Sequence, residues 1–335
     1  MKGLIAVDGG GTKTEFILAD TEGNVLTRNV YEGTNLNSVP LDNVFLTLAN
    51  GVKSAINVAK KNDIEITGAF FGLAGGADER NRELIYNYFK PKYFSKIPFS
   101  NHGDELNATN VGIKEAQNGI VVIGGTGSNV SIKKDGKMMP NPHLSGWGYM
   151  FDNGGGAFDY GKSAVIAVKQ HINKTGTATQ ITSMLEKKLG QSVFDGLKDI
   201  YDGGPTFVAS FAPIVFDAYR NHDLVAWVII KEQANNVAQM INNAHETLGV
   251  DTPAVVGLVG GIYAHQREIL EPLISSQIDD NLTLNFPVES QIYGALMESA
   301  KNAGVEITQE FENNFNDTIK NPILQLQSEN DCMEQ

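Results

Sequence analysis

A strand, a glycine-rich turn and a second strand occur in that order twice in this chain, once at its start and once near its middle. The first copy is AVDGGGTKTEFILAD, residues 6–20, in which three consecutive glycines separate two runs of β-forming residues. The second copy is NGIVVIGGTGSNVSIKKDGK, residues 118–137, with GGTGS as its turn. Few residues are identical between the copies, so we interpret the pattern as an internal duplication of architecture.

The glycine turns have two interpretations. Glycine after a strand commonly marks an ordinary tight turn. The turns at Asp8–Thr12 and Gly124–Ser128 also carry hydroxyl groups, and their bare backbone N–H groups can hold a polyphosphate. The spacing G-x-x-x-x-G-K-[ST] is absent and the first turn leads into a strand, so we expect neither a P-loop nor a Rossmann dinucleotide site.

Strands alternate with helices along the rest of the chain, which predicts an α/β fold. The expected strands are GLIAVDGG, KTEFILAD and VLTRNVYEG as an antiparallel meander, then ITGAFFGLAG, a short strand near IPFS, and AVVGLVGG. Apolar residues recur at three- and four-residue steps after Leu41 and predict a helix there. Further helices are expected over Asp78 to about Phe89, over Asp104–Gln117, over nearly all of Ala157–Gly249, and over Glu289–Ala303.

The length of 335 residues suits about two domains. We assign residues 1–117, with the first glycine turn, to one domain. Residues 118–303, with the second turn and a helical insertion, form the other. Residues 304–335 are polar and acidic, so we expect a loosely attached tail.

The composition excludes several classes of function. With 26 basic and 39 acidic residues the formal charge is −13, and such a surface does not attract nucleic acid or anionic membranes. The single cysteine, Cys332, excludes an intrachain disulfide or an iron–sulfur cage from one chain. No signal peptide is recognisable, and no apolar run reaches the roughly 18 residues of a membrane span. We therefore expect a cytoplasmic protein with small-molecule partners, and a homodimer as one allowed assembly.

Seven segments resemble, in order, those of a known family: GTNLNSV, FGLAG, GDELNATNVG, GGTGSN, SGWGYMF, the run beginning FVASFAPIVFDAYRNHD, and PVESQIYGAL. DGGGTKTEFIL is similar to the first phosphate motif of the actin and hexokinase superfamily, GGTGSN to its second, and VVGLVGG to its adenosine motif. Over about residues 3–303 the chain resembles the BadF/BadG/BcrA/BcrD-type ATPases and, within them, the N-acetylglucosamine kinases. This resemblance implies two ribonuclease-H-like, actin-like ATPase domains with MgATP and the acceptor in an interdomain cleft.

The resemblance also implies a nucleotide site. The residues that match the family's ATP contacts are Gly10, Gly11, Thr12, Lys13, Thr126, Gly127, Ser128, Ala209, Gly260 and Gly261. The alternative interpretation of Lys13 is an ordinary solvent-exposed lysine on a strand. Asp8 ends a strand directly before the phosphate turn, where a carboxylate can hold Mg²⁺ through water, and a turn hydrogen bond is its alternative role.

Asp104 is the candidate catalytic base. Phosphoryl transfer to a hydroxyl group needs a carboxylate that takes the hydroxyl proton. In HGDELNA, Asp104 lies where a helix is expected to begin, so a capping aspartate is the alternative interpretation. The resemblance of GDELNATNVG to the family's catalytic-aspartate segment favours the base, and the nearby His102 is the second choice.

Two loops match the family's sugar contacts. Asn35 in GTNLNS matches the sugar-contacting asparagine, with an Asx-turn as the alternative. The segment SGWG resembles the loop that closes around the sugar, and it contributes Gly146, Trp147 and Gly148. The indole of Trp147 suits either a sugar platform or core packing.

The chain departs from the family pattern after this loop. Where the family usually has Gly-Asp-Glu-Gly, residues 152–155 read DNGG. Asn153 replaces the acid that would contact sugar hydroxyls, and Gly154 replaces the neighbouring glutamate. Asp152 and Asn153 are therefore the candidate substrate-binding residues here, and the identity of the sugar is open.

Together these patterns predict an ATP-dependent kinase that transfers the γ-phosphoryl group to the primary hydroxyl of N-acetylglucosamine or a related hexosamine. A catalytically silent or weak sugar sensor of the same fold is the alternative, because of the DNGG departure. The family's dehydratase activators need cysteines for an iron–sulfur cluster, which one cysteine does not provide. Repressor-type relatives of sugar kinases carry a DNA-binding helix-turn-helix ahead of the fold, and we expect none because the first phosphate turn begins at Asp8.

Overall fold

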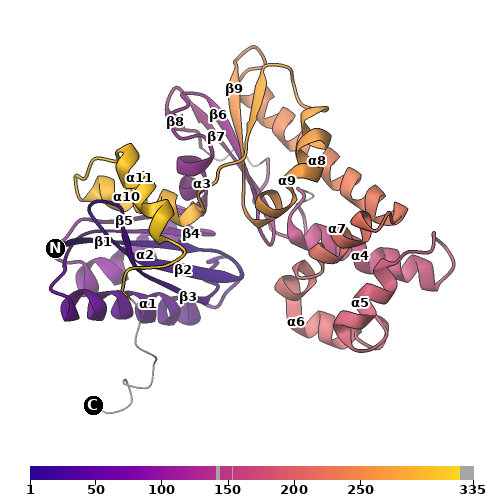
Figure 1. Cartoon of the computed structure of the whole chain (residues 1–335), viewed down its shortest axis with the longest axis horizontal. Coiled ribbons are helices and arrows are strands. Elements are labelled where there is room, and N and C mark those ends of the chain that lie inside the picture. Colours follow the sequence, from indigo (N-terminus) through magenta and orange to yellow (C-terminus); the bar gives the residue numbers. More distant parts are fainter. Residues whose placement is uncertain (141–143, 153, 325–335) are drawn as a thin grey trace. The chain divides into compact units, whose positions relative to one another are not determined.

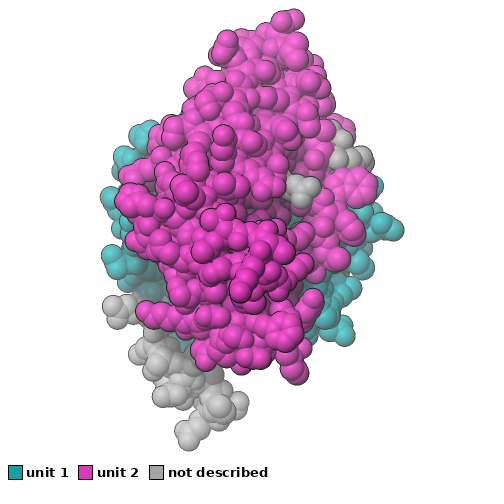
Figure 2. Space-filling view, turned by 90° about the vertical axis from the view of Figure 1, so that its right-hand side faces the viewer, with its two compact units in different colours: residues 1–110, 289–335 teal, residues 111–288 magenta. Residues whose placement is uncertain are grey.

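The computed structural model describes residues 1–140, 144–152 and 154–324 (Figure 1). The chain divides into two compact units, coloured separately in Figure 2. One unit contains residues 1–110 together with the chain from Glu289 onward, and the other contains residues 111–288.

The first unit is a five-stranded sheet with helices on its faces. Its strand order is β3-β2-β1-β4-β5; β1, β2 and β3 are antiparallel, and β4 and β5 run parallel to β1. The strands are β1 (Lys2–Gly9), β2 (Lys13–Asp20), β3 (Val25–Glu32), β4 (Glu65–Leu73) and β5 (Phe99–Gly103). The helices are α1 (Leu41–Lys61), α2 (Glu79–Tyr93), α3 (Asp104–Gly112, ending beyond the unit boundary), α10 (Gln291–Asn302) and α11 (Gln309–Thr318).

Alternation of side chains along β1 gives the sheet two buried faces. Ile5 and Val7 pack with Val44 and Leu48 of α1 in one apolar cluster. The opposite face of β1 and β4 is covered by α10. A glycine is needed at position 68 of β4, because a Cβ atom there would lie 2.6 Å from the carbonyl oxygen of Ser299.

The second unit repeats this topology. Its strand order is β10-β9-β6-β7-β8, in which β6 is antiparallel to β7 and parallel to β9, as β1 is to β2 and β4. The strands are β6 (Gly119–Gly124), β7 (Ser128–Lys134), β8 (Lys137–Met138), β9 (Ala254–Val259) and β10 (Leu282–Asn285). The helices are α4 (Ala157–Ile172), α5 (Ile181–Leu189), α6 (Leu197–Ala209), α7 (Ala212–Arg220), α8 (Leu224–Leu248) and α9 (Gly261–Ser275). The predicted α/β fold and the duplication of architecture are therefore confirmed.

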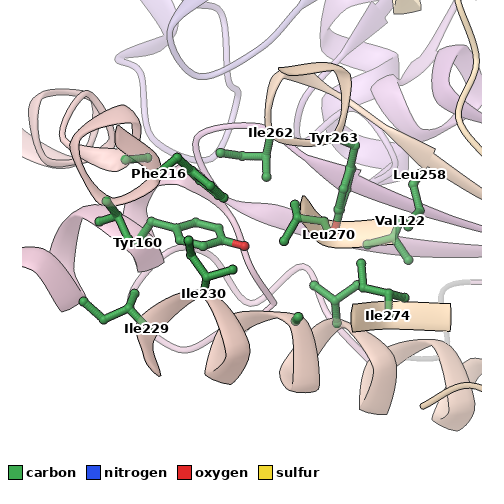
Figure 3. Packing of buried hydrophobic residues seen from close by; sticks show 14 of the residues in the cluster. Val122, Tyr160, Phe216, Ile229, Ile230, Leu258, Ile262, Tyr263, Leu270 and Ile274 are labelled. Carbon is green, nitrogen blue, oxygen red and sulfur yellow. The ribbon is translucent and has the colours of Figure 1, made fainter. Parts of the chain in front are cut away.

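A large apolar cluster holds the second unit together (Figure 3). Val122 and Leu258 come from neighbouring strands of the sheet, while Tyr160 of α4 and Tyr263 of α9 bring aromatic rings from the helices. Both rings are almost completely buried, and burial raises the pKa of each phenol. These tyrosines are therefore neutral packing groups.

The units differ from the expected domains at the C-terminal end. The helix near residues 289–303 was assigned to the second domain, yet α10 lies on the sheet of the first unit because Ile292, Leu296 and Ala300 form its buried stripe. The expectation of a loose tail was wrong for α11. Its Phe315 ring lies 4.7 Å from that of Tyr293, and Ile323 N–H donates to the carbonyl oxygen of Val25 on β3 (3.1 Å).

We expect Phe315→Ala to lower the free energy of unfolding by about 3 kcal/mol, because truncating a buried phenylalanine leaves a cavity. Urea denaturation followed by circular dichroism measures the change. The control is Asn313→Ala on the exposed side of α11, which should change stability by less than about 0.5 kcal/mol. Equal stability of the two variants would mean that α11 adds nothing to the first unit.

Candidate functional site

The candidate residues of the first unit gather at one edge of its sheet. Because β1, β4 and β5 are parallel, their carboxyl ends meet there, which brings together Asp8, the turn after it and Asp104. Hydrogen bonds join the loops at this edge: Thr34 N–H donates to the carbonyl oxygen of Gly10 (3.0 Å) and Ala74 N–H to that of Gly9 (2.7 Å). The loop that contains Asn35 is therefore held against the glycine turn.

The first glycine turn packs closely on a neighbouring loop and is also exposed to solvent. A Cβ atom at Gly33 would collide with the backbone of Gly11, so this close approach requires glycine. The buried hydroxyl groups of Thr14 and Thr34 lie 2.9 Å apart and join the strand after the turn to this loop. Gly11 and Thr12 are exposed. The turn thus presents these two residues to solvent, where a ligand can reach them.

Asp8 has an unusual electrostatic environment. The Nδ2 atom of Asn107 donates a hydrogen bond to its Oδ1 atom (2.7 Å), and Glu15 lies opposite on β2. Burial raises the pKa of Asp8 to about 6, and the negative charge of Glu15 adds to this rise. The hydrogen bond from Asn107 and the positive charge of Lys13 oppose it. A cation bound to the Asp8 carboxylate would offset the free-energy cost of burying its negative charge.

Asp104 is the first residue of α3, directly after β5. Burial raises its pKa well above the usual range, and the carboxylates of Glu105 and Asp8 raise it further. Backbone N–H groups at the start of α3 bond to it and oppose the rise. The aspartate thus makes the local bonds of a capping residue and is also a high-pKa carboxyl beside Asp8. His102 instead places its Nδ1 atom 3.2 Å from Oε1 of Glu105.

Two further candidates in this unit have modest local roles. Asn35 forms the Asx-turn that was its alternative interpretation, since its Oδ1 accepts from Asn37 N–H (2.9 Å). The side chain of Lys13 is 60% exposed and its Nζ atom lies 3.8 Å from Oε2 of Glu15. Glu15 is paired more closely with Arg28 (2.7 Å), which leaves Lys13 the mobility to reach a phosphate.

In the second unit, α4 fixes the orientation of the second glycine turn. Ala157 N–H donates to the carbonyl oxygen of Gly125 (2.9 Å), and Phe158 N–H donates to that of Thr126 (2.8 Å). In a trans peptide the N–H points opposite to the C=O, so the N–H groups of Thr126 and Gly127 point away from α4. Adjacent N–H groups with one direction form an anion cradle. Apart from its chain neighbours, no described atom lies within 4 Å of a Cβ atom placed at Gly127, so there is open space on the Cβ side of this residue.

Asp159 supports this turn and was missed by the sequence interpretation. Its Oδ2 atom accepts from Gly156 N–H (2.9 Å), and Gly156 packs so tightly on Gly127 that a Cβ atom would collide. Burial raises the pKa of Asp159 to about 6. An acidic residue three positions after the N-cap residue Gly156 is the signal that could have indicated it.

The adenosine motif lies beside the second glycine turn. Gly260 has φ +111°, and a Cβ atom there would meet the backbone of Gly124. Gly261 starts α9 and has open space at its Cβ position. Ala209 is the last residue of α6 and only 8% exposed, so little of its side chain is available to a ligand.

The expected sugar loop is held by Asp152. Its Oδ2 atom accepts from Gly146 N–H (3.1 Å) and Gly148 N–H (3.0 Å), two glycines with positive φ. Trp147 between them is 65% exposed, so it is not part of the core of its unit. The carboxylate of Asp152 is therefore used to shape the loop.

Gly154 of the DNGG segment is closely surrounded by side chains. A Cβ atom at Gly154 would collide with Oγ of Ser128 and lie 2.6 Å from Cε of Met240. A glutamate at this position would therefore require these side chains to shift. Asn153 lies outside the described residues.

Within the described part of the chain, no group of three or more histidine, cysteine, aspartate or glutamate side chains converges as a metal cage. A magnesium site of the kind that uses one carboxylate, water and substrate phosphates does not require one. None of the described helices has both the length and the apolar character of a membrane span.

Comparison with known proteins identifies several relatives. The chain is 26% identical over 291 residues to an N-acetyl-D-glucosamine kinase of Dictyostelium discoideum, covering 83% of this chain and 90% of the relative. It is 28% identical over 267 residues to an N-acetylmuramic acid/N-acetylglucosamine kinase of Clostridium acetobutylicum, covering 78% and 85%. A crystal structure of a candidate N-acetylglucosamine kinase from Porphyromonas gingivalis has the same fold, with a TM-score of 0.72, 20% identity, and coverage of 89% of this chain and 99% of that one.

A family model covers almost the whole chain. It is described as the BadF/BadG/BcrA/BcrD ATPase family, and it matches residues 5–296. The match includes both sheets, both glycine turns and Asp104. The chain therefore belongs to the BadF/BadG/BcrA/BcrD ATPase family.

Proposed function

We propose that this protein is an ATP-dependent sugar kinase that transfers the γ-phosphoryl group to the primary hydroxyl of N-acetylglucosamine or a closely related hexosamine. The observation that carries the proposal is the pair of carboxyl groups with raised pKa, Asp8 and Asp104, which lie at one sheet edge next to an exposed glycine turn. Two relatives named as N-acetylglucosamine kinases support the substrate class.

Asp104 is proposed as the general base. A base that accepts a proton from a sugar hydroxyl works best when its pKa lies near the working pH, and the raised pKa of Asp104 moves it in that direction. The same carboxylate is proposed to bind the acceptor, because it must reach the hydroxyl that it deprotonates.

Asp8 is proposed to hold Mg²⁺ through water. The donor chemistry fits this ion, since a carboxylate of raised pKa gains most from a cation. Bound Mg²⁺ would neutralise charge on the transferred phosphoryl group. The phosphates are assigned to the two glycine turns, through Gly10, Gly11, Thr12 and Lys13 in one unit and Thr126, Gly127 and Ser128 in the other.

The nucleoside is assigned to Gly260, Gly261 and Ala209, and the sugar to Asn35, Gly146, Trp147, Gly148, Asp152 and Asn153. The open space beside Gly127 and Gly261 supports a ligand at these turns. A cytoplasmic location and a homodimer remain predictions.

The competing function is a sugar sensor without turnover. It is favoured by the loss of the family's acidic pair at residues 153 and 154. A coupled assay of ADP release over a panel of amino sugars, together with thermal-shift measurements, separates the two. Turnover with N-acetylglucosamine supports the kinase, a thermal shift without turnover supports the sensor, and the absence of both overturns the proposed sugar site.

A further inference from the structure

Asn107 occupies a completely buried position next to Asp8. It lies three residues after Asp104 on α3, so both side chains project from one face of the helix. Its Nδ2 atom donates to Oδ1 of Asp8 at 2.7 Å, which joins α3 to the end of β1. This amide therefore connects the two carboxyl groups on which the proposed chemistry depends.

Glycines on two other elements make room for Asn107. At Gly72 of β4 a Cβ atom would collide with the side-chain amide of Asn107. At Gly294 of α10 it would collide with the backbone carbonyl group of Asn107. The amide is thus held between Gly72 of β4 and Asp8 of β1, while α10 packs on the backbone of the same residue.

The side chain of Asn107 does not maximise the stability of the folded protein. The Oδ1 atom of Asn107 is buried and has no hydrogen-bond partner among the described residues. A buried acceptor without a partner destabilises the folded state, so an amide is a poor choice if its only task is packing. Its side chain donates a hydrogen bond to a carboxylate, from Nδ2 to Oδ1 of Asp8 (2.7 Å), so the amide is placed for that contact.

We propose that Asn107 is a positioning residue of the phosphoryl-transfer site, which orients the Asp8 carboxylate for Mg²⁺ and fixes it relative to the helix that carries Asp104. This inference rests on the proposed function, because it assigns the cation to Asp8. The bond engages Oδ1 of Asp8 and so restricts the rotation of the carboxylate. Residues that orient a metal-binding carboxylate typically contribute 10- to 100-fold to metal affinity.

The test is calorimetric titration with a nonhydrolysable ATP analogue, in Mg²⁺ and in EDTA. For the unsubstituted protein, we expect tighter binding in Mg²⁺. For Asn107→Ala, we expect that Mg²⁺-dependent gain to fall by about tenfold, while affinity in EDTA stays the same. If Mg²⁺ increases the affinity of Asn107→Ala for the analogue as much as that of the unsubstituted protein, the inference is overturned. It is also overturned if the unsubstituted protein binds the analogue equally well in Mg²⁺ and in EDTA.

Asn110 provides a matched control on the same helix. Its Nδ2 atom donates to the carbonyl oxygen of Gly294 (3.1 Å) and to Oε1 of Glu298 (2.8 Å), so it joins α3 to α10 without touching Asp8. Asn110→Ala should keep the full Mg²⁺-dependent gain. An equal loss in both variants would assign the effect to the attachment of α3 and overturn the inference.

A compensated variant separates positioning from packing. Gly72→Ala adds a methyl group where Asn107→Ala removes an amide, so the double variant should recover thermal stability relative to Asn107→Ala. The Mg²⁺-dependent gain should remain lost, and its recovery would mean that Asn107 only fills space. If Asn107→Ala does not fold, the double variant carries the test. If the unsubstituted protein binds no nucleotide, the proposed function itself fails, which is a different result.

Discussion

Asp104→Asn should lower kcat by roughly 10²-fold or more, because asparagine keeps the size of the side chain but cannot accept the hydroxyl proton. The affinity for ATP should change little, since Asp104 is assigned to the acceptor and not to the nucleotide. Steady-state kinetics with N-acetylglucosamine, combined with nucleotide titration, measures both quantities.

His102→Asn is the matched control for this prediction. The His102 ring lies against Glu105, so its loss should leave kcat within a few-fold of the original value. If Asp104→Asn keeps near-normal turnover while His102→Asn loses it, the histidine is the base and our assignment is wrong.

Asp8→Asn should abolish most activity and yet stabilise the protein at neutral pH. The pKa of Asp8 is raised from 3.8 to about 6 in the folded protein, so the folded state holds this proton more tightly than the unfolded chain. Stability is therefore lost as the pH rises from about 4 to 6, and the loss is complete above that range. A shift of this size corresponds to about 3 kcal/mol, which asparagine would recover because its oxygen still accepts from Asn107.

Urea denaturation at pH 7.5 and at pH 4 tests whether Asp8→Asn raises the free energy of unfolding. The variant should be more stable at pH 7.5, and the difference should shrink at pH 4, where the native carboxyl is protonated. A destabilised variant at pH 7.5 would show that the ionised carboxylate is a net stabilising group, and the argument from burial would fail.

The central strands β1, β4, β6 and β9 were predictable because each contains an apolar run that ends in or near glycine. Four residues of β10 were not predicted, since LTLN is short and lies among polar residues. α3 is also shorter than expected: it ends at Gly112, which packs on Gly257, and Lys114 has positive φ. Periodicity within one segment does not record such contacts between distant segments.

The proximity of the two candidate aspartates was predictable from the sequence. Asp8 lies at the end of β1 and Asp104 directly follows β5, and parallel strands bring their carboxyl ends together. Asn107 carries no signal of its own, because its role depends on the space left by Gly72 and Gly294 in two distant elements. The same holds for Gly154, whose close contacts with Ser128 and Met240 are visible only in the folded chain.

The placement of α10 on the first sheet dictates an order of assembly. β1 and β4 are made early, but the helix that covers one of their faces is made only after residues 111–288 have been synthesised. The second unit is continuous in sequence and can complete its core while the first still exposes an apolar surface. A nascent chain that stalls before Glu289 would therefore expose the β1 and β4 face, which makes such fragments substrates for chaperones or prone to aggregation.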